Sequence, residues 1–556
     1  MAKRPNILLF MVDELRYPPV YDGPELRDWM RTNLVAQTLF RETGVELDRH
    51  YAMSSACVPS RASIFTGQYP SLHGVSQTDG IGKNAWDPGM FWLDPDTVPT
   101  MGDWFRAGGY QTHYKGKWHV SFADILVPGT KNSLPSNDDE GVPYPQNVET
   151  YRAGDRLDDY GFTGWIGPEP HGSAKANCGM VRDPHFAAET RRLIDELEAR
   201  KDDDTPFLIV NSYTNPHDIV FFGLKWEQFG FPFTDGTIPD IPEPPTRGED
   251  LSTKPTCQQS YVDNYPKMFL RQPTIELYRQ FYYYLQKQVE AHILSVYEHF
   301  KKSRFFENTI IVFTSDHGEM LGAHGGMHQK WYQSYEETIH VPMVFAGPLI
   351  PSTPRRSDVI TSHADIIPTL LGLAGIDVDA AHEELERTHN EVRRLVGRDL
   401  SRVVMGTGTI PPGEPVYFAT TDDVAQGLKQ VTGQKHWHNV LPPSCVETIV
   451  VELDGAVWKY SRYYVDQQDY SAISNPTLQN ARDRVQSIPD QYEMYKLTDD
   501  QLETTNLVHP GNETRESIVM RPRLQRMLDE QRALKALTPR EQGVTRADGE
   551  GVLATA

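Results

Sequence analysis

The cysteine at position 57 has the surroundings of a reactive residue. It lies in the stretch SSACVPSRASIFTGQYPSLHG, just ahead of Pro59, which fits the first position of a helix that Gly67 would end. The N-terminus of a helix binds anions, and Arg61 adds a positive charge four residues further on. A lone cysteine is most often a small buried hydrophobe without chemistry. A cysteine-dependent phosphatase would need arginine six residues after the cysteine, where this chain has Ser63.

Other residues that could do chemistry follow three apolar runs that are typical of buried strands. Residues 6–12 are followed by Asp13 and Glu14, and residues 206–210 are followed by His217 a few positions later. Residues 309–315 are followed by Asp316 and His317. In open α/β sheets the ligand binds beyond the carboxyl ends of the strands. Carboxylates placed there suit a hard divalent cation, and an imidazole makes Mn²⁺ more plausible than it is in an all-oxygen site. Taken alone, an Asp-Glu pair is more often a loop or a helix cap, and a lone histidine is usually a surface or core residue.

The segment from Cys57 to Gly67 reads C-x-P-S-R-x-x-x-x-T-G, which resembles the modification motif of the sulfatase family. In that family the cysteine is oxidised to formylglycine by a formylglycine-generating enzyme. A hydrated aldehyde carries two hydroxyls on one carbon, so that one can attack sulfur and the other can later expel sulfate, through a covalent sulfo-enzyme. A motif match needs structural context before it identifies a site.

A second motif, the tetrapeptide G-K-W-H, contains Lys117 and His119. If this segment is extended, the two side chains point the same way. The tetrapeptide is typical of sulfatases, and the resemblance implies that Lys117 contacts the sulfate and that His119 holds or deprotonates the second hydroxyl. The related phosphonate monoester hydrolases carry Tyr and Thr there, so this difference favours a sulfate ester as substrate. Without the resemblance, both residues would be interpreted as solvated.

The resemblance also implies roles for the remaining site residues. His217 would protonate the leaving alcohol, and Lys330 would be a second contact to the sulfate. One divalent ion, Ca²⁺ or Mn²⁺ with Mg²⁺ as a further candidate, would be bound by Asp13, Glu14, Cys57, Asp316 and His317. Glu14 stands where the family usually has a second aspartate. His324 and His328 are weaker candidates in a glycine-rich loop, and we assign no role to Trp86, Trp92, Trp165 or His171.

The pattern of elements predicts an α/β fold in two parts. Apolar strands alternate with helical segments up to about residue 400, including helices over 184–200 and 274–302, whereas short strands separated by turns follow. We therefore expect a catalytic domain over 1–400 and a C-terminal subdomain over 401–556 that has a short antiparallel sheet, a terminal helix near 513–536 and a tail. The resemblance implies an alkaline-phosphatase-like sandwich with a large mixed, mostly parallel sheet and a smaller antiparallel sheet.

Composition limits the partners. The 556 residues carry a net charge of −22, which disfavours nucleic acid or an anionic membrane as the main partner, so an anionic substrate needs a locally basic site. The four cysteines contain no C-x-x-C pair, which argues against a disulfide framework or a zinc cluster. We see no signal peptide and no transmembrane segment, and we expect a cytoplasmic homo-oligomer.

Three functions remain open at this point. The first is hydrolysis of small anionic sulfate monoesters, aryl or alkyl. The second is hydrolysis of phosphonate monoesters or phosphodiesters with the same nucleophile. The third is a non-catalytic binding protein in which Cys57 is never converted.

Overall fold

A seven-stranded sheet forms the centre of the molecule. The structure is a computed structural model, and it describes residues 3–201, 203–269, 275–351, 355–425, 427, 440–466 and 488–540. The strand order is β3-β4-β1-β5-β6-β2-β7, and within this sheet only β6 runs antiparallel to its neighbours. The strands are β1 Asn6–Asp13, β2 Val45–Tyr51, β3 Gln111–Gly116, β4 Phe207–Pro216, β5 Thr309–Ser315, β6 Met343–Ala346 and β7 Arg355–Ser362. The prediction of a mixed, mostly parallel sheet is confirmed.

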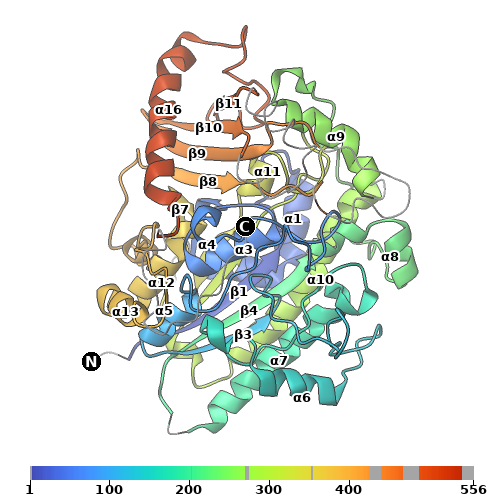
Figure 1. The fold of residues 1–556 in the computed structure, drawn as a ribbon, viewed down its shortest axis with the longest axis vertical. Helices are drawn as coiled ribbons and strands as arrows, with labels where there is room; N and C mark the ends of the chain where they lie inside the picture. The colour runs from blue at the N-terminus through green and yellow to red at the C-terminus, as the bar shows by residue number, and fades with distance from the viewer. Residues whose placement is uncertain are drawn as a thin grey trace.

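Helices cover both faces of this sheet (Figure 1). Side chains alternate along β1, so that Ile7, Leu9 and Met11 pack into one core and Leu8, Phe10 and Val12 into the other. The first core includes residues of α3 Cys57–Thr66, α5 Met101–Ala107 and α12 Ile366–Ala374; the second includes residues of α2 Val35–Thr43, α7 Gly179–Ala199 and α10 Glu276–Phe300. Burial on both faces explains why the central strands are continuous apolar runs rather than alternating ones.

The predicted C-terminal sheet is also present, as four antiparallel strands in the order β11-β10-β9-β8. They are β8 Val416–Thr420, β9 Cys445–Leu453, β10 Ala456–Tyr464 and β11 Gln491–Lys496. Helix α16, Arg515–Lys535, packs Met520, Leu524 and Leu528 against one face of this sheet. The domain boundary at residue 400 stays a prediction.

The remaining helices are short connections or lie in the long loops. They are α1 Pro24–Asn33, α4 Pro70–His73, α6 Pro145–Gly154, α8 Leu224–Phe229, α9 Thr256–Met268, α11 Glu336–Ile339, α13 Val378–Leu385 and α14 Ser401–Val404, with 3-10 turns η1 Asp158–Tyr160, η2 Lys175–Asn177, η3 His217–Phe221, η4 Leu251–Thr253, η5 Phe306–Asn308 and η6 His363–Asp365. Among the described residues, no helix is both long enough and apolar enough to cross a bilayer.

Six of the predicted site residues lie where strands β3, β4, β1 and β5 end: Asp13, Glu14, Lys117, His217, Asp316 and His317. These four strands are neighbours and parallel, so their carboxyl ends share one edge of the sheet. The segment G-K-W-H is not extended, because β3 ends at Gly116 and His119 adopts a left-handed φ of 57°. Lys117 and His119 therefore lie in the irregular segment that follows the strand.

Candidate active site

Cys57 is the first residue of α3, two positions before Pro59, and Gly67 ends the helix in the left-handed conformation. The Cys57 side chain is buried, with Sγ 3.1 Å from His317 Nε2 and 3.5 Å from Asp13 Oδ1. Burial, and next the charge of Asp13, raise the pKa of the Cys57 thiol well above its ordinary value. The unmodified side chain is therefore a neutral thiol.

Four predicted metal ligands come together around this sulfur: Asp13, Cys57, Asp316 and His317 each offer one donor atom, and these atoms all lie within 4.8 Å of one another. His317 Nε2 is 4.0 Å from Asp13 Oδ1 and 3.8 Å from Asp316 Oδ1. Such spacings suit donors that surround a single ion. His317 Nδ1 lies 2.9 Å from the Gly318 carbonyl, so a proton on Nδ1 leaves the Nε2 lone pair for a metal. The residues present thus fit one divalent cation.

Arg61 holds the outer oxygens of the two aspartates. Its Nη2 is 3.0 Å from Asp13 Oδ2 and its Nε is 2.8 Å from Asp316 Oδ2, while Nη1 donates to the Lys117 carbonyl and to Ser212 Oγ. Lys117 Nζ adds a contact of 2.7 Å to Asp13 Oδ2. Burial alone would raise the pKa of Asp13, but Lys117 and Arg61 outweigh it and hold this pKa well below the usual range. Asp13 is therefore ionised.

Glu14 lies apart from the four clustered ligands. Its Oε2 is 2.9 Å from Lys330 Nζ, whereas Oε1 is buried without a hydrogen-bond partner in the described part of the chain. Its carboxylate also groups with Asp13 and His217, with donor atoms within 4.8 Å of one another. Glu14 thus lies next to the predicted metal site and forms an ion pair with the predicted sulfate-binding lysine.

His217 begins the turn after β4 and lines the same cavity as Cys57. Burial, and then the positive charge of Lys117, lower the pKa of His217 well below its ordinary value. An anion in the cavity would favour the protonated form. All the predicted catalytic residues, Cys57, Arg61, Lys117, His119, His217 and Lys330, therefore lie at or beside one end of the sheet.

His119 belongs to a group that sequence reasoning missed. Its Nε2 is 2.7 Å from Asp79 Oδ1, and His171 Nδ1 is 2.7 Å from Asp79 Oδ2. Asp79 and His171 lie in irregular loops without periodicity, so no pattern in the chain connects them with His119. The weaker candidates are placed elsewhere: His324 lies 2.7 Å from Glu249, and His328 Nδ1 lies 3.2 Å from the Tyr278 hydroxyl.

The cavity above Cys57 has a volume of about 410 Å³. Its polar lining includes Cys57, Lys117, His119, His217 and Lys330. Much of the remaining described wall is apolar and comprises Ile81, Val220, Phe221, Phe222, Met268, Phe269, Trp331 and Val424. The lining thus combines basic side chains with a large apolar surface.

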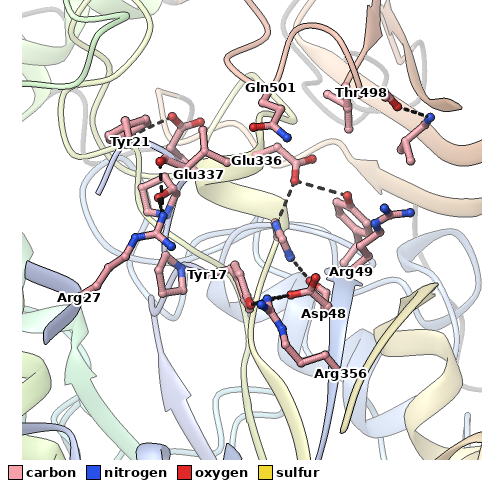
Figure 2. A pocket seen from close by; sticks show the side chains of 17 residues that line it. Tyr17, Tyr21, Arg27, Asp48, Arg49, Glu336, Glu337, Arg356, Thr498 and Gln501 are labelled. Carbon is pink, nitrogen blue, oxygen red and sulfur yellow. Dashed lines mark hydrogen bonds and ion pairs between the residues drawn. The ribbon is translucent and has the colours of Figure 1, made fainter. Parts of the chain in front are cut away.

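A second cavity, of about 390 Å³, lies near β2 and the edge strand β7 and has a different character (Figure 2). Its charged side chains interact with near neighbours: Arg356 with Asp48, Arg49 with Glu452, and His340 with Glu336. Tyr17 Oη also donates to Asp48, as Figure 2 shows from close by. No cysteine or serine lines this cavity among the described residues, so we do not interpret it as the active site.

Comparison with known proteins gives a consistent result. The family model described as Sulfatase matches residues 5–376. A choline-sulfatase of Rhizobium meliloti (strain 1021) is 26% identical over 383 residues, which cover 68% of this chain and 69% of the relative. Two solved structures share the fold at 18% identity: a 2-O GAG sulfatase (TM-score 0.59, covering 95% of this chain and 92% of that one) and a phosphonate monoester hydrolase from Silicibacter pomeroyi (TM-score 0.60, covering 96% of each).

Proposed function

Because the chain belongs to the sulfatase family and is a sulfuric ester hydrolase, we propose that it cleaves sulfate monoesters with a formylglycine made from Cys57. The observation that carries this proposal is the position of Cys57, whose Sγ lies among the donor atoms of Asp13, Asp316 and His317 at the start of α3. A side chain at this position faces both a cation site and a basic cavity. A formylglycine-generating enzyme would act on the chain during maturation.

One divalent ion would be held by Asp13, Asp316, His317 and the side chain at position 57. A bound ion would polarise a sulfate oxygen and lower the pKa of a hydroxyl on the modified side chain. Arg61 and Lys117 keep Asp13 ionised and oriented for this task. The mixture of carboxylate and imidazole donors is compatible with Mn²⁺ as well as with Ca²⁺ or Mg²⁺.

The basic residues would stabilise charge during sulfuryl transfer. Lys117 and Lys330 line the cavity beside Cys57, where fixed positive charges stabilise the developing negative charge. His217 would deliver a proton to the leaving oxygen, because an anionic ester raises its pKa on binding. His119 would accept the proton of a hydroxyl at position 57.

The alcohol portion of the substrate would contact the apolar side chains that line the cavity. Phe221, Phe269 and Trp331 offer aromatic surface there, which favours an aryl or apolar alkyl group. We therefore propose that aryl sulfates are turned over faster than sulfated sugars. Lys117 and His119, in place of Tyr and Thr, favour sulfate over phosphonate monoesters.

The test combines mass spectrometry with turnover. A peptide that contains Cys57 should lose ~18 Da, the change from thiol to aldehyde that creates the covalent nucleophile. The same preparation should cleave a nitrophenyl sulfate faster than a nitrophenyl phenylphosphonate. Cys57→Ala should abolish turnover with an unchanged circular dichroism spectrum, whereas the matched control Cys445→Ala, in the antiparallel sheet, should remain active.

Three results would contradict the proposal. An active Cys57→Ala variant would exclude Cys57 as the source of the nucleophile. Turnover of the phosphonate faster than that of the sulfate would show that the site is adapted to phosphonate monoesters. An unmodified thiol with no activity, after co-expression with a formylglycine-generating enzyme, would support the binding protein instead.

A further inference from the structure

Asp79 connects two histidines at the wall of the cavity. Its two carboxylate oxygens lie 2.7 Å from His119 Nε2 and 2.7 Å from His171 Nδ1. The side chains of Asp79 and His119 are 6% and 7% exposed, so water hardly competes for the contact between them, whereas the His171 side chain is 18% exposed. All three residues line the cavity above Cys57. None of the three belongs to the proposed metal cluster, but their own donor atoms also lie within 4.8 Å of one another, as the ligands of a metal ion would.

The contact to Asp79 decides which nitrogen of His119 carries a proton. A carboxylate only accepts hydrogen bonds, so the hydrogen of a neutral His119 lies on Nε2 and points at Asp79. The lone pair is then on Nδ1. This atom is buried and has no hydrogen-bond partner in the described part of the chain. Since His119 lines the cavity, its unpartnered nitrogen is the candidate proton acceptor of this residue.

His171 keeps the charge of Asp79 in place. Burial opposes the protonated form of His171, but Asp79, Asp124 and Glu169 outweigh it and raise the pKa of His171 to about 9. Burial lowers the pKa of His119 to about 4 against the pull of Asp79, and Lys117 and His171 add to this lowering. At neutral pH the group therefore consists of one imidazolium, one carboxylate and one neutral imidazole.

We infer that Asp79 is a positioning residue that holds His119 with Nδ1 as the proton acceptor, and that His171 holds Asp79. This inference rests on the proposed function, because it names how His119 is prepared for its role there. In the step that would release sulfate, the second hydroxyl at position 57 loses its proton to Nδ1, its O–H electron pair forms the C=O bond, and the carbon–oxygen bond to sulfate breaks. His119 then becomes an imidazolium that faces the Asp79 carboxylate. The arrangement corresponds to the orienting acid of a catalytic triad, without Asp79 itself taking a proton.

The first test is spectroscopic and needs no active enzyme. An imidazole N–H that donates to a buried carboxylate gives a proton NMR signal far downfield. We expect one such signal to be absent from both Asp79→Asn and His119→Gln in the full-length protein with unmodified Cys57. The signal of the buried His324–Glu249 pair, which Glu249→Gln identifies, should persist in both variants as an internal control. A downfield spectrum that is the same in wild type and Asp79→Asn would overturn the inference.

The second test is kinetic. With conversion of Cys57 matched by mass spectrometry, Asp79→Asn should lower kcat for an aryl sulfate about 10²–10⁴-fold, the range of general acid–base catalysis, with KM changed less than about threefold. His171→Gln should reduce kcat less, because Asp79 still contacts His119. An effect on KM alone would overturn the positioning role. So would a second metal ion per chain that is lost in Asp79→Asn, because the group would then be a metal site.

The two proposals fail in distinguishable ways. A wild-type protein with no sulfatase activity contradicts the proposed function and leaves the NMR result to decide whether Asp79 orients His119. An active wild type together with an equally active Asp79→Asn contradicts only the inference about Asp79.

Discussion

Arg61 balances the charges of the site. Its guanidinium contacts both buried aspartates of the metal cluster and also donates to the Lys117 carbonyl and to Ser212 Oγ. The planar group can make these contacts at once because its five N–H donors point in fixed directions. Without Arg61, two carboxylates would lie close together with Lys117 as the nearest cation to Asp13.

The first prediction concerns this residue. Arg61→Ala should lower the free energy of unfolding by about 3–5 kcal/mol, because it leaves buried charges without their partner. Arg523→Ala is a matched control: it removes an arginine whose ion pair with Asp454 is largely exposed, and should cost less than about 1 kcal/mol. Denaturant unfolding measures both. An equal decrease in the free energy of unfolding in the two variants would contradict the argument that the buried ion pairs of Arg61 stabilise the protein more than an exposed pair does.

The surroundings of His324 indicate that the free energy of unfolding depends on pH. Burial opposes its protonated form, but Glu249 and Glu337 outweigh burial and raise its pKa to about 9, above the ordinary 6.5. A histidine whose pKa is raised by folding stabilises the protein below pH 6.5, and this contribution is lost as pH rises through 9.

His324→Gln should therefore cost about 3 kcal/mol more at pH 6 than at pH 10, as expected for a pKa difference of this size. Urea unfolding of wild type and variant across this range measures the difference. A difference in the free energy of unfolding between wild type and variant that does not change with pH would contradict the raised pKa of His324.

Strand β3 illustrates how one element positions the chemistry. Gly116, at its end, has φ of 117°, and a Cβ there would lie 1.7 Å from the Ser212 carbonyl oxygen of β4. Only glycine allows this close approach, and Lys117 follows immediately. The main-chain N–H of Lys117 donates to the same Ser212 oxygen, so the two strands are joined at the position where the site begins.

Gly116→Ala should therefore displace Lys117 and lower kcat/KM at least about 10²-fold, since displacements of the order of 1 Å cost this much. Gly109→Ala, just before the same strand, is the control. Gly109 also has a positive φ, but a Cβ there would meet only Arg4 Nη2 at 3.4 Å. It should cost about 1–2 kcal/mol in stability and leave turnover per folded molecule unchanged. An equal loss of kcat/KM in Gly116→Ala and Gly109→Ala would contradict the role of Gly116 in placing Lys117.

At the scale of the whole molecule, the small sheet contributes to the site of the large one. Thr420, the last residue of β8, donates to the Ser55 carbonyl, two residues before Cys57. Asp422 accepts a hydrogen bond of 2.9 Å from Trp331 Nε1, which lines the cavity. One hydrophobic cluster contains Tyr51 and Ala56 together with Val416, Phe418 and Val450.

This shared core predicts that the two sheets unfold together. In hydrogen exchange followed by mass spectrometry, peptides of β1 and β9 should lose protection over the same range of denaturant concentration, because the two sheets share this hydrophobic cluster. A Cys57→Ala sample provides the control for any effect of the modification. Loss of protection in β9 at clearly lower denaturant would show two independent units, as a boundary near residue 400 would allow.

The sequence by itself determined the chemistry that local patterns encode. The apolar strands and the motif around Cys57 predicted the α/β fold and brought Asp13, Asp316 and His317 to one edge, because neighbouring parallel strands end on the same side of a sheet. Only the tertiary structure showed that Glu14 pairs with Lys330 and that Asp79 and His171 join His119. Those contacts arise where loops fold over the sheet edge, and loop conformation depends on long-range packing that no spacing along the chain records.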